Sequence, residues 1–131
     1  MINEKDVKHY KDAGFKQPEG KKYDSEKPRM DLVDPLALEG LAKVLTFGAQ
    51  KYAANNWRNG LQYSRVSAAL LRHMAAIQRG EDIDPESGLA HIDHLGCCWM
   101  FLSNYMKRED LYKNNDDRWK PDERTKTADN S

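Results

Sequence analysis

Residues 72–94 read RHMAAIQRGEDIDPESGLAHIDH and hold three of the chain's four histidines together with five acidic residues. Apolar residues recur at helical spacing on both sides of an acidic stretch that begins at Gly80. We therefore expect two helices that fold back on each other around a short acidic turn. Such a hairpin would bring imidazoles and carboxylates into one small volume, which is how a protein builds a site for a divalent metal ion.

The composition predicts one soluble domain. Of the 131 residues, 39% are hydrophobic and 32% are charged, and the formal net charge is zero. This length supports a core of its own, and the balanced charge gives no electrostatic reason to expect nucleic acid or a membrane as partner. No apolar run approaches the roughly 20 residues that cross a bilayer, and the N-terminus is polar. We expect a cytoplasmic protein whose only cysteines, Cys97 and Cys98, are buried thiols.

Three helices are expected between two polar flanks. The predicted helices run from Asp34-Pro35 to Asn55-Asn56, from about Ser64 to Gly80, and from either Asp84-Pro85 or Ser87 to about Lys107. No segment alternates convincingly with period two, so the fold class is all-α. We assign residues 1–30 to a polar arm, residues 31–107 to a helical catalytic domain, and residues 108–131 to a polar, partly disordered tail.

The first predicted helix carries more apolar surface than one neighbouring helix can cover. Its apolar stripe consists of Leu38, Leu41, Leu45, Ala49 and Tyr52. We therefore expect a small helical bundle that is completed by oligomerisation, as a homodimer or homotetramer.

Two histidines share one face of the third predicted helix. His91 and His94 are three residues apart, so both project from the same side. His73 lies seven residues before Gly80, and His91 lies seven residues after Asp84. At a rise of about 1.5 Å per residue, His73 and His91 would both sit roughly 10 Å from the turn, level with each other. Alone, His73 would be read as a hydrogen-bonded core residue, but the pair opposite favours a ligand.

Carboxylates in the turn could complete a metal site with these histidines. The acidic residues of the turn are Glu81, Asp82, Asp84 and Glu86. The alternative is that they solvate the loop and cap the third helix. Asp93 points away from both histidines of its helix, so it could orient a ligand. The surplus of carboxylates favours Mg²⁺ or Mn²⁺ over zinc, with iron or cobalt as alternatives.

Cations, amides and one aromatic residue could bind a nucleotide. The candidates are Lys21, Lys22, Lys27, Arg29, Lys51, Asn55, Asn56, Trp57 and Arg58. Cations suit phosphates, amides suit base edges, and a flat ring suits stacking on a base. The alternative is that these are ordinary surface charges and that Trp57 anchors the core.

Six motifs in fixed order resemble the phage dATP/dGTP diphosphohydrolase family, a MazG-like group associated with viruses that alter their adenine pool. They are DSEKPRMDL (24–32), AKVLTFGAQKY (42–52), NWRNG (56–60), RH (72–73), GEDIDPESGL (80–89) and HIDH (91–94). The resemblance covers residues from about 20 to 106. It implies an all-α nucleoside triphosphate pyrophosphohydrolase fold, an oligomer, a divalent metal ion and, in a virus, work in the host cytoplasm. The implied reaction converts purine deoxynucleoside triphosphates to monophosphate and pyrophosphate.

The chain departs from the broader MazG-like pattern at its metal ligands. That superfamily uses E-x-x-E on one helix and E-x-x-D on the next, whereas His91-Ile-Asp-His94 falls in the place of E-x-x-D and Arg72-His73 falls near the end of E-x-x-E. The carboxylate cluster of the superfamily is therefore not carried over, and which acids join the histidines stays open.

These observations give one hypothesis and two alternatives. The expected metal ligands are His73, His91, His94, Glu81, Asp84 and Glu86, with Glu81 and Glu86 as catalytic carboxylates. The expected substrate contacts are Lys27, Arg29, Lys51, Asn56, Trp57, Arg58 and Arg72. One alternative is an HD-type phosphohydrolase, although no His-Asp dipeptide occurs in the chain. The other is a non-catalytic helical module that binds a host protein.

Overall fold

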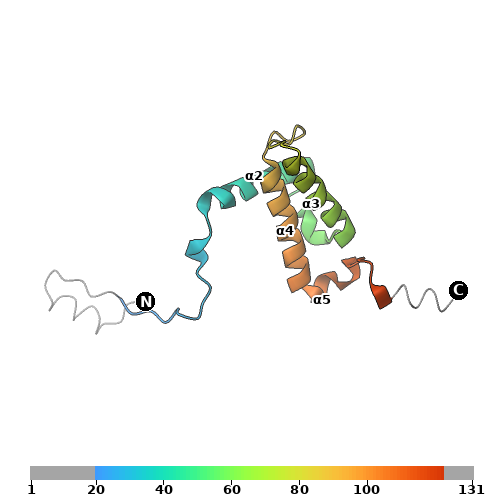
Figure 1. Cartoon of the computed structure of the whole chain (residues 1–131). Helices are drawn as coiled ribbons and strands as arrows, with labels where there is room; N and C mark the ends of the chain where they lie inside the picture. The colour runs from blue at the N-terminus through green and yellow to red at the C-terminus, as the bar shows by residue number, and fades with distance from the viewer. Residues whose placement is uncertain (1–19, 123–131) are drawn as a thin grey trace, which may run out of the picture. The chain divides into compact units, whose positions relative to one another are not determined.

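The computed structural model describes residues 20–122 and confirms the all-α class (Figure 1). Its elements are η1 (Met30–Leu32), α2 (Pro35–Lys51), η2 (Asn56–Asn59), α3 (Tyr63–Gln78), α4 (His91–Lys107), α5 (Glu109–Tyr112) and η3 (Lys113–Asn115). Most of the arm predicted for residues 1–30, and the tail beyond residue 122, lie outside the described residues. Contacts divide the chain into two units, one ending at Leu32 and one beginning at Val33. None of the helices in residues 20–122 is long and apolar enough to cross a membrane.

Helix α2 begins where the sequence predicts, but it ends earlier. The Asp34 carboxylate accepts a hydrogen bond of 2.8 Å from the backbone N–H of Ala37, which caps the helix ahead of Pro35. The helix ends at Lys51 because the chain then turns through Asn55, which is left-handed with φ 64°.

The predicted apolar stripe of α2 is only partly buried, because its middle from Leu41 to Ala49 is half-buried and its two ends are exposed. Gly40 and Val44 are the buried residues of the helix, whereas Leu38 and Tyr52 are exposed. The glycine allows a close approach to α4, because a Cβ atom at Gly40 would lie 2.4 Å from the Asp93 carboxylate. Part of the stripe therefore stays uncovered within one chain.

Helices α3 and α4 form the expected hairpin, but the prediction that α4 starts at Asp84 or Ser87 is wrong. The helix starts at His91. The Asp84 carboxylate accepts hydrogen bonds from the Glu86 N–H (3.1 Å) and the Ser87 hydroxyl (3.2 Å), so it stabilises a turn instead of a helix N-terminus. Gly88, with φ 72°, continues this turn, and an isolated bridge pairs Ile83 with Ala90. The loop from residue 81 to 90 is therefore compact.

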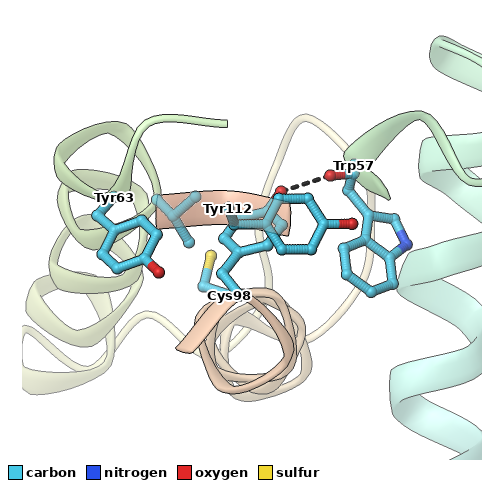
Figure 2. Packing of buried hydrophobic residues seen from close by; sticks show 6 residues of the cluster. Trp57, Tyr63, Cys98 and Tyr112 are labelled. Carbon is cyan, nitrogen blue, oxygen red and sulfur yellow. Dashed lines mark hydrogen bonds between the residues drawn. The ribbon is translucent and has the colours of Figure 1, made fainter. Parts of the chain in front are cut away.

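The core lies between α3, α4, η2 and α5 (Figure 2). Its buried residues are Trp57, Tyr63, Val66, Cys98, Tyr105 and Tyr112. Tyr105 is fully buried and packs against the rings of Tyr63 and Tyr112, at centroid distances of 6.0 and 4.5 Å. Because Tyr112 belongs to α5, the packing of this unit continues beyond Lys107, into the segment that the sequence analysis assigned to the tail.

Candidate active site

One open pocket of about 950 Å³ collects most of the predicted site residues. We call it the central pocket; its walls come from α2, η2, α3, the 81–90 loop and α4. The predicted site residues that line it are Lys51, Asn56, Trp57, Arg58, Arg72, His73, Glu81, Asp84, Glu86, His91 and His94. Its volume suits a small-molecule ligand. Lys27 and Arg29 belong to the unit that ends at Leu32. There the Arg29 guanidinium donates two hydrogen bonds of 2.7 Å to the Asp31 carboxylate.

Three histidines meet where α3 crosses the start of α4. The Nδ1 atoms of His73 and His91 share a hydrogen bond of 2.9 Å, so one of the two rings carries its proton on Nδ1 and the other does not. The rings of His73 and His94 stack, with centroids 4.7 Å apart and planes 6° apart. The three histidines thus lie together as expected, although His91 is in the first turn of α4 and not seven residues into the helix.

Carboxylates of the 81–90 loop face two of these histidines. Glu81 Oε2 lies 3.6 Å from His91 Nε2, and Asp84 Oδ2 lies 3.4 Å from His94 Nε2. The Ser87 hydroxyl also lies 2.6 Å from His94 Nε2. Each histidine of α4 therefore has an acidic partner from the loop.

The electrostatics of the cluster favour a neutral His73, a neutral His94 and a charged Asp84. Burial lowers the pKa of His73 and of His94 below the usual value. The imidazoles of His94 and His91 lower the pKa of His73 further, whereas the Asp84 carboxylate partly offsets the effect of burial on the pKa of His94. Burial alone would raise the pKa of Asp84, but hydrogen bonds from the Glu86 N–H and the Ser87 hydroxyl outweigh it, so the pKa is lowered overall. Neutral imidazoles and ionised carboxylates are the forms that bind metal ions.

The donor set fits a divalent metal ion in its chemistry. His91 is 5% exposed, and its Nε2 atom is buried without a hydrogen-bond partner, which a ligand in the pocket would satisfy. Across residues 20–122, no group of three or more His, Cys, Asp or Glu side chains is arranged to hold a metal ion as the side chains stand. Coordination would therefore require rotation of the imidazoles away from one another. Asp93, which the sequence analysis considered as an orienting residue, faces Gly40 of α2 instead.

Positive side chains also line the central pocket. Lys51 of α2 donates a hydrogen bond of 2.6 Å to the Glu86 carboxylate, which links α2 to the 81–90 loop. Arg72 of α3 makes no ion pair or hydrogen bond with the part of the chain described here, so its guanidinium is available to an anion. Arg79, which is not among the predicted site residues, also lines the pocket, and its Nη2 atom lies 3.8 Å from Glu81 Oε2. The signal was present, because Arg79 follows Arg72 by seven residues and shares its helix face.

Trp57 contributes to the core as well as to the pocket wall. Its indole stacks on Phe101 with centroids 4.8 Å apart and planes 15° apart, and the Arg58 guanidinium lies 4.4 Å from the ring centroid. Trp57 as a whole is 9% exposed. Stacking of a base on Trp57 stays a prediction and would require Arg58 to move or to lie beside the base.

Known proteins provide an independent comparison. A family model described as dATP/dGTP diphosphohydrolase, N-terminal, matches residues 17–118. A dATP/dGTP diphosphohydrolase of Salmonella phage PMBT28 is 39% identical over 83 residues, which are 63% of this chain and 28% of the phage protein. The matched part therefore spans less than a third of that relative's length. No solved structure matches the chain.

Proposed function

Because the chain belongs to the dATP/dGTP diphosphohydrolase, N-terminal, family, we propose that it hydrolyses purine deoxynucleoside triphosphates to monophosphate and pyrophosphate. The observation that carries the proposal is the central pocket, which places three imidazoles and three carboxylates beside Lys51, Arg58 and Arg72. After rotation of the imidazoles, the imidazole and carboxylate side chains would hold a metal ion, and the cationic side chains would hold phosphates. The reaction would take place in the nucleotide pool of a phage-infected cytoplasm.

The proposed cofactor is Mg²⁺ or Mn²⁺. The proposed ligands come from His73, His91, His94, Glu81, Asp84 and Glu86. When bound, such an ion polarises a phosphoryl oxygen and makes water a nucleophile at neutral pH. The orphaned Nε2 of His91 and the two facing carboxylates support this assignment.

The remaining roles follow from position in the pocket. Glu81 and Glu86 are the candidates to accept the proton of the attacking water. Glu86 is held by Lys51, and it would become free when a triphosphate takes over that ammonium group. Arg72 has no competing partner within residues 20–122, which makes it the strongest candidate to neutralise charge that develops on the phosphates. Asn56 also lines the pocket, where its amide could contact the base.

We also propose that the active form is a homo-oligomer. Ile92, Trp99 and Met106 recur every seven residues along α4 and are all exposed, as are Leu71 and Met74 on α3. These side chains form apolar stripes outside the core cluster, which a second copy of the chain would cover. Light scattering on the purified protein should give a dimer or tetramer, and Trp99→Glu should shift it to monomer; a wild-type monomer would contradict the proposal.

A nucleotide panel tests the activity. All eight common dNTPs and NTPs are incubated with Mn²⁺ or Mg²⁺, with and without EDTA, and the products are resolved by chromatography. Monophosphate plus pyrophosphate from dATP or dGTP, lost with EDTA, is the expected result. A deoxynucleoside product would favour HD-type chemistry, and no product with any metal would favour a non-catalytic binding module; either result contradicts the proposal.

A further inference from the structure

The segment Asn55–Gly60 forms a wall of the central pocket without an α-helix to hold it. It contains a single 3-10 turn, and left-handed residues flank it: Asn55 with φ 64° and Gly60 with φ 97°. Such short turns have poorer internal hydrogen bonds than α-helices. The positions of Asn56 and Arg58 in the pocket therefore depend on what else binds this backbone.

Two tyrosine hydroxyls bind the segment from outside the pocket. Tyr105 of α4 donates a hydrogen bond of 2.5 Å to the carbonyl of Trp57, drawn in Figure 2, and accepts one of 3.2 Å from the N–H of Leu61. Tyr112 of α5 donates a hydrogen bond of 2.8 Å to the carbonyl of Arg58. Both tyrosines are buried, and neither lines the pocket. They can act on a ligand only through the segment that they hold.

The chain beyond α5 supports the same wall. The Asn115 amide lies against Gly60, so closely that a Cβ atom there would stand 2.9 Å from its nitrogen. The Asp117 carboxylate accepts a hydrogen bond of 2.8 Å from the N–H of Ser64, in the first turn of α3. Residues 112–117 therefore contact the chain at both ends of the connection between η2 and α3.

We propose that Tyr105 and Tyr112 are positioning residues for substrate binding. By fixing two consecutive carbonyls, they set where the Arg58 guanidinium and the Asn56 amide face the pocket. Arg58 depends on this backbone twice, because its Nε donates a 2.9 Å hydrogen bond to Asn55 and its guanidinium lies over Trp57. The inference rests on the proposed function, since it assigns these contacts to nucleotide binding.

The histidine cluster provides the contrast that makes the inference testable. His73, His91 and His94 belong to α3 and α4 and make no hydrogen bond to either tyrosine. Loss of a tyrosine hydroxyl should therefore weaken ground-state binding and leave the chemical step intact. A merely structural role would instead lower the fraction of active enzyme, which reduces kcat at unchanged KM.

The test compares Tyr112→Phe and Tyr105→Phe with a matched control, Tyr63→Phe. Tyr63 is 3% exposed and packs in the same aromatic cluster, but its hydroxyl does not bind the segment. Steady-state kinetics on the dNTP that the wild type turns over best should show KM raised about fivefold in Tyr112→Phe, with kcat within about twofold, as expected for loss of one hydrogen bond that holds a binding group. Tyr63→Phe should keep the wild-type KM.

Amide hydrogen exchange separates failure of this inference from failure of the proposed activity. The amides of residues 57–61 should exchange faster in Tyr105→Phe and Tyr112→Phe than in Tyr63→Phe. An active wild type with unchanged KM in the variants, or with equal exchange in all three, overturns the inference alone. A wild type that turns over no nucleotide overturns the proposed function, and the assignment of the tyrosines to substrate binding fails with it. If Tyr105→Phe does not fold, the KM and the amide exchange of Tyr112→Phe test the inference alone.

Discussion

The contact between Gly40 of α2 and Asp93 of α4 predicts that Gly40→Ala is destabilising. The added methyl group would lie 2.4 Å from Oδ1 and 2.5 Å from Cγ of Asp93, well inside van der Waals contact. Either the carboxylate leaves its position or α2 moves away from α4. Movement of α2 would also strain the ion pair between Lys51 and Glu86 at the pocket.

The expected loss of folding stability in Gly40→Ala is the difference of two effects. Overpacking at a buried contact costs about 1–3 kcal/mol, and the better helix propensity of alanine returns up to about 1 kcal/mol. The free energy of unfolding should therefore fall by about 1–2 kcal/mol, which lowers Tm by roughly 5 °C. Thermal unfolding followed by far-ultraviolet circular dichroism measures this shift.

Gly48 provides a matched control in the same helix. No atom outside its own helical backbone lies within 4 Å of the Cβ position at Gly48, so Gly48→Ala should raise stability by about the propensity difference alone. Adding Asp93→Ala to Gly40→Ala should restore most of the loss, because the clashing carboxylate is then absent. If Gly40→Ala is as stable as Gly48→Ala, the packing of α2 on α4 described here is wrong.

Three further outcomes follow from the structure. Gly60→Ala should destabilise the protein by about 1–3 kcal/mol, because the φ of 97° is strained for alanine and the Asn115 amide blocks the Cβ position. Urea unfolding measures this change in stability, and a neutral effect would contradict the geometry. Burial holds the folded-state pKa values of His73 and His94 below 6.5. The metal-free protein should therefore be most stable above pH 6.5 and lose stability as the pH falls below that value and through the lower folded-state pKa values. Urea unfolding in EDTA from about pH 7.5 to about pH 5.5 should show this loss of stability, and a flat profile would refute it. Lys51→Met should leave Tm nearly unchanged, because its ion pair is exposed, yet raise KM for the nucleotide; an unchanged KM would remove it from the phosphate contacts.

The helical class and the histidine cluster could be predicted because both depend on local signals. Asp34 caps α2 as the Asp-Pro pair indicates, and the three-residue spacing of His91 and His94 places both on one face. The start of α4 could not be predicted in the same way. Asp84 before a proline satisfies the local rules for a helix cap, but Gly88 and the pairing of Ile83 with Ala90 close the loop first.

The packing of α2 and the partners of the buried tyrosine hydroxyls depend on tertiary contacts that local sequence patterns do not indicate. The apolar stripe of α2 predicts burial along the whole helix, yet Leu38 and Tyr52 at its ends are exposed, and the close approach to α4 is at Gly40, where there is no side chain. Likewise, nothing local to Tyr105 or Tyr112 indicates that their hydroxyls meet carbonyls more than forty positions earlier in the chain. Such contacts follow from the assembled fold alone.

The role of His91 is the central claim, and release of pyrophosphate from dATP and dGTP tests it most directly. The comparison is between the wild type, His91→Ala, and Asp82→Ala as a control from the same acidic loop that does not line the central pocket. With Mn²⁺ or Mg²⁺ present, the account predicts metal-dependent release by the wild type and by Asp82→Ala, and none by a folded His91→Ala protein. A His91→Ala protein that binds metal and releases pyrophosphate at the wild-type rate would contradict it.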